Sequence, residues 1–208
     1  MAMPLSPWAQ DTLPLPLARI PEPWHSLLAH PAVLTPRLER YYRDSIGLEV
    51  VTAEIKAGAL IRKILLRLAS DTRIVEFGAI RVDLERLPRT LREAVLAGKQ
   101  PFGNLLHQER FPHQAGKRVC FSVQTKTLIL PANVPRPQGR LYGRTHAILA
   151  ATGEPLAHSS EILSGVQPDN ITSIAPPSPI SINKSRESPS KIVQQLGPGQ
   201  DPLPDSAF

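Results

Sequence analysis

The sequence predicts an α+β fold built on an antiparallel β-sheet. Segments with strand-like patterns outnumber helical ones, and neighbouring strand segments are joined by turns too short for a parallel crossover. The chain has 208 residues, of which 41% are hydrophobic, and this is enough for one domain with its own core. We therefore expect one folded body whose strands pair mainly with their sequence neighbours.

The prolines divide the chain into three parts. Residues 1–23 are proline-rich and apolar, which is typical of an extended lead-in packed on a folded body, with Trp8 as an anchor. Residues 24–164 carry the periodic patterns and form the predicted domain. Residues 165–208 are rich in proline, serine, glutamine and asparagine. Such a segment buries too little apolar surface to offset its ordering entropy, so we predict a disordered tail.

Three helices are expected in the body. The first covers residues 24–29 and ends before a turn at His30-Pro31. The second begins with Thr35 as its N-cap and Pro36 as its first helical residue. The third covers residues 87–96 and ends at Gly98, a suitable left-handed cap.

The remaining periodic segments are predicted strands. A Ser-Asp-Thr turn at 70–72 joins two of them, and a Thr-Gly-Glu-Pro turn at 152–155 joins the last two, so both pairs are expected to be antiparallel. Residues 131–139 form a loop. The expected strands cover residues 48–57, 60–69, 74–82, 119–130, 141–150 and 156–163.

The charge distribution argues against a nucleic-acid partner. The formal net charge is +6, but acidic and basic residues alternate between residues 37 and 99. Alternation is typical of a solvated surface, whereas a phosphate-binding stripe would gather its bases on one face. The modest positive excess suits the attraction of a small anionic substrate.

Other features narrow the compartment and the chemistry. No apolar run is long enough to span a membrane, and the N-terminus lacks the basic start of a secretory signal. The single cysteine, Cys120, excludes an internal disulfide framework and is typical of a reducing cytoplasm. We interpret His107 and His113 as loop residues rather than metal ligands, because no supporting cysteine or acidic pattern accompanies them.

Arg62 is the residue that the pattern alone singles out. In the predicted strand LIRKILLRLA it shares a face with aliphatic residues only, and a buried guanidinium is costly unless a partner meets it. The pattern indicates a clamp for a carboxylate, or else an internal salt bridge or a guanidinium that reaches solvent at the strand end. The aliphatic neighbours on that face are Leu60, Ile64, Leu66 and Leu68.

Two further segments carry candidate residues. Glu161 lies near the end of the last predicted strand, where a surface position is the simpler interpretation and an inward position would make it a base or a hydrogen-bond acceptor. The segment GKQPFGNLL, residues 98–106, has two glycines and a proline around Phe102. It indicates either a loop that aims backbone N–H groups or a plain helix cap and linker.

Four segments in order resemble the chorismate pyruvate-lyase (chorismate lyase) family: LIRKILL, AVLAGKQPFGNLL, LYGR and GEPLAHSSEIL. In that family an arginine-bearing strand is followed by a G-K-T-P-L-G loop, a W-G-R strand start and a closing strand that carries a glutamate. The resemblance covers roughly residues 26–164. The order of the motifs, more than any one of them, carries the resemblance.

The resemblance implies a sheet flanked by helices that enclose a ligand cavity, and elimination of pyruvate from chorismate to give 4-hydroxybenzoate, a precursor of quinones such as plastoquinone or ubiquinone. It matches Arg62 to the family's carboxylate-binding arginine, Phe102 to the loop residue whose backbone N–H binds the same carboxylate, and Glu161 to the essential glutamate, either a base or an orienting group. The family uses no metal and no organic cofactor. We accordingly expect a cytoplasmic monomer that binds chorismate, does not bind nucleic acid and does not span a membrane.

The chain departs from compact family members in two places. The segment 107–139 is longer, and Glu161 follows the turn at 153–155 by one residue more, so a bulge or a longer turn is needed to keep Glu161 facing inward. One alternative is a non-catalytic domain of the same fold that senses an aromatic carboxylate, as in transcription regulators, although residues 1–23 are too short for their helix-turn-helix domain. Another is a basic protein that recruits partners through PPSP-like tail segments.

Overall fold

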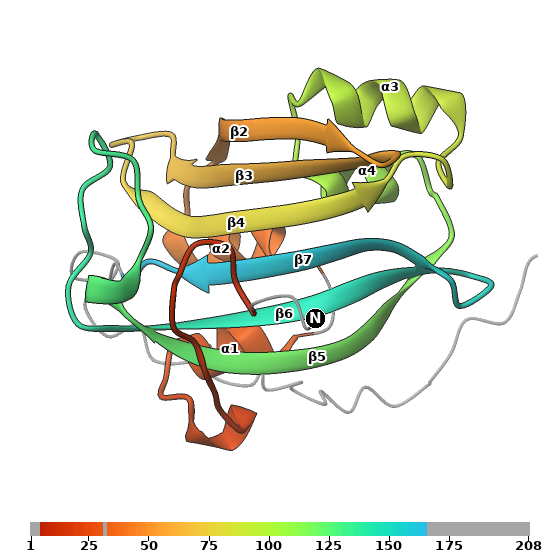
Figure 1. The fold of residues 1–208 in the computed structure, drawn as a ribbon. Helices are drawn as coiled ribbons and strands as arrows, with labels where there is room; N and C mark the ends of the chain where they lie inside the picture. Colours follow the sequence, from red (N-terminus) through yellow and green to blue (C-terminus); the bar gives the residue numbers. More distant parts are fainter. Residues whose placement is uncertain (1–4, 31–32, 166–208) are drawn as a thin grey trace, which may run out of the picture. The chain divides into compact units, whose positions relative to one another are not determined.

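The computed structural model describes residues 5–30 and 33–165, and within them it has one seven-stranded antiparallel sheet with four α-helices (Figure 1). The predicted α+β class is confirmed. The predicted tail lies outside the described residues, apart from Gly165. The strands are ordered β1-β5-β6-β7-β4-β3-β2 across the sheet. Their bounds are β1 Leu13–Pro14, β2 Ile46–Lys56, β3 Ala59–Leu68, β4 Ile74–Asp83, β5 His113–Gln124, β6 Arg140–Ala150 and β7 Pro155–Leu163.

The helices form two pairs that pack on opposite ends of one sheet face. Helices α1 and α2 share a hydrophobic cluster with β3 through residues such as Leu28, Leu38 and Leu66. Helices α3 and α4 share another with the far ends of β3, β4 and β7. Neither helix pair covers the middle of this sheet face. The helices are α1 Trp24–Ala29, α2 Thr35–Tyr42, α3 Arg89–Ala97 and α4 Phe102–Gln108.

The first part of the lead-in, around Trp8, covers the other face of the sheet, whereas its later part, around Ile20, joins the cluster of α1 and α2. In Figure 1 the first part crosses in front of the strands, while α1, α2 and α4 lie behind them. Trp8 is 1% exposed, packs edge-on against Phe77, and donates a hydrogen bond from its indole Nε1 to the carbonyl oxygen of Gly78 at 2.8 Å. The ammonium of Lys63 lies over the Trp8 ring. Trp8 is therefore the anchor that the sequence suggested.

Helix ends follow the predicted chemistry in part, and α3 spans Arg89–Ala97 where residues 87–96 were predicted. Gly98 has φ of 67° and caps α3, with its N–H bonded to the carbonyl of Val95, as expected of a left-handed cap. The start of α2 was predicted one residue late. Leu34 is the N-cap, Thr35 is already helical, and no side chain caps this helix.

Two segments differ from the prediction. Residues 98–106 contain helix α4 where only a turn was expected. Strand β5 begins at His113, six residues before the predicted start, and a 3-10 helix at Thr125–Thr127 replaces its predicted end. Residues 113–118 are mostly exposed, so they lack the apolar alternation that identifies a strand, and their pairing with β6 supplies the structure instead.

Candidate functional site

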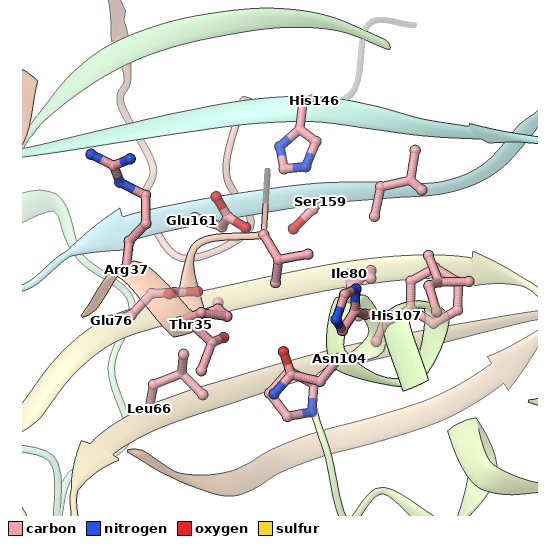
Figure 2. A pocket seen from close by; sticks show the side chains of 18 of the residues that line it. Thr35, Arg37, Leu66, Glu76, Ile80, Asn104, His107, His146, Ser159 and Glu161 are labelled. Carbon is pink, nitrogen blue, oxygen red and sulfur yellow. The ribbon is translucent and has the colours of Figure 1, made fainter. Parts of the chain in front are cut away.

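A cavity of about 820 Å³ lies over the uncovered middle of the sheet (Figure 2). Its floor is formed by the inward side chains of β3, β4, β6 and β7, and its walls by α2, α4 and the connection after α1. Its volume is in the range of small-molecule sites. Basic and imidazole groups outnumber acidic ones around it. Its titratable lining residues are His30, Arg37, Arg40, Arg62, Glu76, His107, His113, His146 and Glu161.

The strand register explains which side chains reach the cavity. Residues directly opposite on neighbouring strands point to the same face, so each register line crosses the floor as a row. One row places Arg62 in line with Ser159 and His146, and the next places Ile64 in line with Glu161 and Arg144. The alternation predicted for β3 is correct, because Arg62 stands on the buried cavity face and its neighbour Lys63 points to the opposite face.

Arg62 is the buried cation at the β3 side of the cavity. It is 2% exposed, its Nη1 and Nη2 atoms donate long hydrogen bonds of 3.4 Å to the carbonyls of Val95 and Gln100, and its Nε has no partner among the described residues. Burial lowers the pKa of the guanidinium. No carboxylate of the described residues forms an ion pair with Arg62, so the internal salt bridge considered from the sequence is not present there. The group is held in place with capacity left for an anion.

Phe102 is brought close to Arg62 by the chain that joins α3 to α4. The carbonyl of Gln100 accepts the Arg62 bond, and Phe102 begins α4 two residues later. As the first helical residue, Phe102 has an N–H without an intrahelical acceptor. Its side chain is 3% exposed and also lines the cavity. The segment thus places a backbone donor beside the guanidinium.

Glu161 lies on the β7 side of the same cavity, and its side chain is 12% exposed. The register of β6 with β7 shifts between Ile148 and Leu149, which is the bulge that an inward-facing Glu161 requires. Arg144 on β6 donates from Nε to Glu161 Oε2 at 2.5 Å. Arg144 also donates to the carbonyls of Leu28 and His30, so it ties the connection after α1 to the glutamate.

The structure brings the three predicted site residues to one cavity, but Glu161 does not contact Arg62. Their strands are separated by β4, and the two positions are offset by two residues in register. With about 4.8 Å between strands and about 3.4 Å per residue, their Cα atoms lie about 12 Å apart. A ligand that contacts both side chains must therefore span the floor of the cavity.

Glu76 is a cavity residue that the sequence reasoning missed. It lies on β4, is 4% exposed, and its Oε2 has no hydrogen-bond partner among the described residues. Burial, and then the charge of Glu161, raise the pKa of this carboxyl well above its usual value, while Arg144 opposes the rise. The available signal was the one used for Arg62, a charged residue within the apolar strand IVEFGAI.

Gly78 provides the space between these two carboxyl groups. It pairs directly with Glu161 and lies two residues after Glu76 on the same face. A Cβ at this position would lie 2.8 Å from Ile64 Cγ1 and 3.0 Å from Glu76 Oε1. Only glycine fits without displacing Ile64 or the Glu76 carboxyl.

His146 was also missed, and two other histidines were misplaced. His146 Nδ1 is buried with no partner among the described residues, and burial lowers the pKa of the ring, so the neutral form is favoured in the cavity. His107 and His113 were interpreted as loop residues. The structure instead places them in α4 and at the start of β5, and both line the cavity. Within residues 5–30 and 33–165, no three metal-ligating side chains converge.

Comparison with known proteins gives distant likenesses only. No family model and no curated protein matches the chain. A gene product from Staphylococcus aureus subsp. aureus is similar over 57% of this chain and 83% of its own, at 10% identity and a TM-score of 0.39. The possible transcriptional regulator YydK from Bacillus subtilis subsp. subtilis is similar over 64% of this chain and 63% of its own, at 9% identity and a TM-score of 0.41. We take no residue role from either. Among the helices that the structure describes, none is both long and apolar enough for a membrane span.

Proposed function

We propose that the protein binds a small ring carboxylate in this cavity and that its reaction is elimination of pyruvate from chorismate. One observation carries the proposal: the buried Arg62, with an unpartnered Nε, faces a cavity whose other side holds Glu161. A buried guanidinium with unused donor capacity suits a ligand carboxylate. The order of the four motifs that resemble chorismate lyases supports chorismate as that ligand.

The cavity residues have separate roles in this reaction. Arg62 and the N–H of Phe102 hold the ring carboxylate at the β3 side. Glu161 meets the 4-hydroxyl at the β7 side with Oε1, because Arg144 already occupies its Oε2. The products are 4-hydroxybenzoate and pyruvate. Aromatisation of the ring supplies the driving force, so the protein contributes mainly by holding one reactive conformer in a site shielded from water.

A second candidate is a non-catalytic domain that senses an aromatic carboxylate. The observation that favours it is the Arg144–Glu161 ion pair. A glutamate whose oxygen already accepts a charged donor is well suited to orient a hydroxyl group and less suited to remove a proton. Arg144 also holds the carbonyl of His30, so ligand contact with Glu161 is linked to the connection between α1 and α2.

One experiment separates the two candidates. Purified protein is incubated with chorismate without added cofactor, and 4-hydroxybenzoate and pyruvate are followed together. The lyase proposal expects equimolar products, lost in Arg62→Met and retained in Arg67→Met, since Arg67 pairs with Glu49 away from the cavity. Product at the uncatalysed rate contradicts the lyase. Calorimetric binding of 4-hydroxybenzoate without any turnover supports the sensing domain.

A further inference from the structure

Glu76 is a buried acid that the proposed reaction has not yet used. Among the described residues it is the only buried carboxylic side chain. In Figure 2, Glu76 and Glu161 extend toward the same space from the neighbouring strands β4 and β7. Oε2 of Glu76 has no hydrogen-bond partner among the described residues, and a buried polar atom that stays unpaired is energetically costly. A ligand in the cavity is one source of a partner.

The register sets Glu76 and Glu161 as a diagonal pair. Glu161 lies opposite Gly78, and Glu76 is two residues before Gly78, so the backbones are about 7–8 Å apart and the long side chains reach across the bare glycine. Two carboxylates this close in a dry site disfavour a double negative charge, and one of them retains a proton. Arg144 lies beside Glu161, so the proton belongs on Glu76.

Other charged groups border this pair from each neighbouring element. Oε2 of Glu76 has no hydrogen-bond partner among the described residues, so this oxygen keeps its capacity to donate or accept. The groups are Arg62 on β3, Arg144 on β6, Glu161 on β7, Arg37 and Arg40 on α2, and His30 before α2.

We propose that Glu76, as a neutral acid, donates its proton to an ether oxygen of the ligand next to the carbon whose hydroxyl contacts Glu161. This inference rests on the proposed function and deepens it. The ligand class is then a cyclic diene carboxylate with an enol-ether leaving group beside a hydroxyl-bearing carbon. A flat benzoate without such an oxygen leaves Oε2 of Glu76 unpaired and binds less well.

The step balances because the proton that Glu76 gives to the leaving group is replaced by the proton that Glu161 takes from the ring. The C–O bond of the enol ether breaks, its electron pair goes to oxygen, and that oxygen takes the proton of Glu76 to leave as the enol of pyruvate. The hydroxyl-bearing ring carbon loses its hydrogen as a proton to Glu161, and the C–H electron pair forms the last double bond of the aromatic ring. Glu161 then returns the proton to Glu76, so the pair ends as it began, without an external oxidant or cofactor.

The test is the variant Glu76→Gln, which keeps the size and the donor capacity of the side chain but cannot release a proton. With chorismate, we expect KM to stay near the wild-type value and kcat to fall by about 100-fold or more, the usual contribution of a general acid. The wild-type kcat also falls as the buffer becomes alkaline and Glu76 ionises, and this alkaline loss is absent in Glu76→Gln. A kcat equal to wild type, or the same alkaline loss in the variant, overturns the proposal.

A binding measurement keeps this inference separate from the lyase itself. Calorimetry compares 3-methoxybenzoate, which carries an ether oxygen next to ring carbon 4, with benzoate on wild type and Glu76→Gln in weakly acidic and weakly alkaline buffer. We expect the preference for 3-methoxybenzoate to shrink in alkaline buffer for wild type, because ionised Glu76 no longer donates to the ether oxygen, and to stay constant for the variant. If chorismate is not turned over but this pattern appears, the lyase is wrong and the donor role of Glu76 stands. If the preference does not change with pH in wild type, the donor role is wrong even when turnover is observed. Unchanged melting of the variant shows that it is folded.

Discussion

Replacing Arg62 with methionine should leave the fold as stable as before while abolishing ligand binding. A buried guanidinium costs several kcal/mol of desolvation, and its present partners return little, because both hydrogen bonds are 3.4 Å long and Nε has no partner among the described residues. The carbonyl of Val95 also accepts the N–H of Gly98, so it stays paired in the variant. We expect the free energy of unfolding to be unchanged or raised by about 1–2 kcal/mol, which is about 2–4 °C in the melting midpoint per kcal/mol.

The same substitution is expected to lower the affinity for a ligand carboxylate. A hydrogen bond to a charged group contributes about 1.5–3 kcal/mol, so loss of two such bonds to a ligand carboxylate amounts to about 3–6 kcal/mol, or about 10²–10⁴-fold in affinity. Thermal denaturation and calorimetric titration with 4-hydroxybenzoate measure the two quantities on the same sample.

The matched control is Arg67→Met, on the same strand but on the other face. Arg67 is partly exposed and bonds Glu49 at 2.6 Å and the carbonyl of Thr72 at 2.9 Å. Loss of such a pair costs up to about 1 kcal/mol and leaves binding unchanged. If Arg62→Met destabilises the protein more than Arg67→Met does and still binds 4-hydroxybenzoate normally, Arg62 is a structural residue and the clamp is refuted.

Three further predictions test the cavity floor and its limits. Gly78→Ala is expected to lower the free energy of unfolding by about 1–3 kcal/mol and to weaken ligand binding, because its Cβ would lie 2.8 Å from Ile64 Cγ1 and 3.0 Å from Glu76 Oε1. Thermal melting measures the stability and titration calorimetry measures the binding. A variant that is fully stable and binds the ligand normally would contradict the packing described. Because the pKa of Glu76 is raised in the folded protein, the native state keeps a proton on this carboxyl at pH values where the unfolded state has released it. The contribution of this proton to the free energy of unfolding is therefore present in acid and is lost as pH rises through the folded-state pKa of Glu76. Urea denaturation from weakly acidic to weakly alkaline pH should show that the free energy of unfolding falls more steeply with pH in wild type than in Glu76→Gln, since the histidines contribute equally to both proteins. An equal dependence on pH in the two proteins would disprove the raised pKa of Glu76. Deletion of residues 166–208 should leave chorismate turnover unchanged, because the cavity lining described lies between His30 and Glu161, and a large loss of product would place the tail in the site.

Alternation along β3 made the position of Arg62 predictable. A period of two residues fixes which side chains share a face, and the apolar neighbours of Arg62 identified that face as buried. The same argument applied to the strand IVEFGAI would have found Glu76, since an acid within an aliphatic run needs a partner as much as a base does.

The position of Glu161 could not be settled from the sequence alone. One extra residue reverses the facing of a strand, and the register shift beside Ile148 and Leu149 is seen only in the pairing of β6 with β7. Arg144 as its partner, and the placing of His107 and His113 on the cavity wall, depend on contacts between segments far apart in the chain. Local patterns do not encode such contacts. The first residues of β5, from His113, were not predicted for a related reason: they form a strand because they pair with β6, and not because their side chains are buried.

The anchoring of the lead-in has a consequence for how the chain is completed during synthesis. Its contacts join Trp8 to Gly78, Pro7 to Lys63 and Leu5 to Ser160, over separations of 70, 56 and 155 residues. Residues 5–8 therefore dock only after nearly the whole domain that follows them has been synthesised, and their docking is a late event with a large loop-closure cost. Trp8 bonds the carbonyl of the same glycine that separates the two carboxyl groups, and Leu5 accepts a bond from Ser160 on β7, so this support of the cavity floor is complete only once β7 has been synthesised.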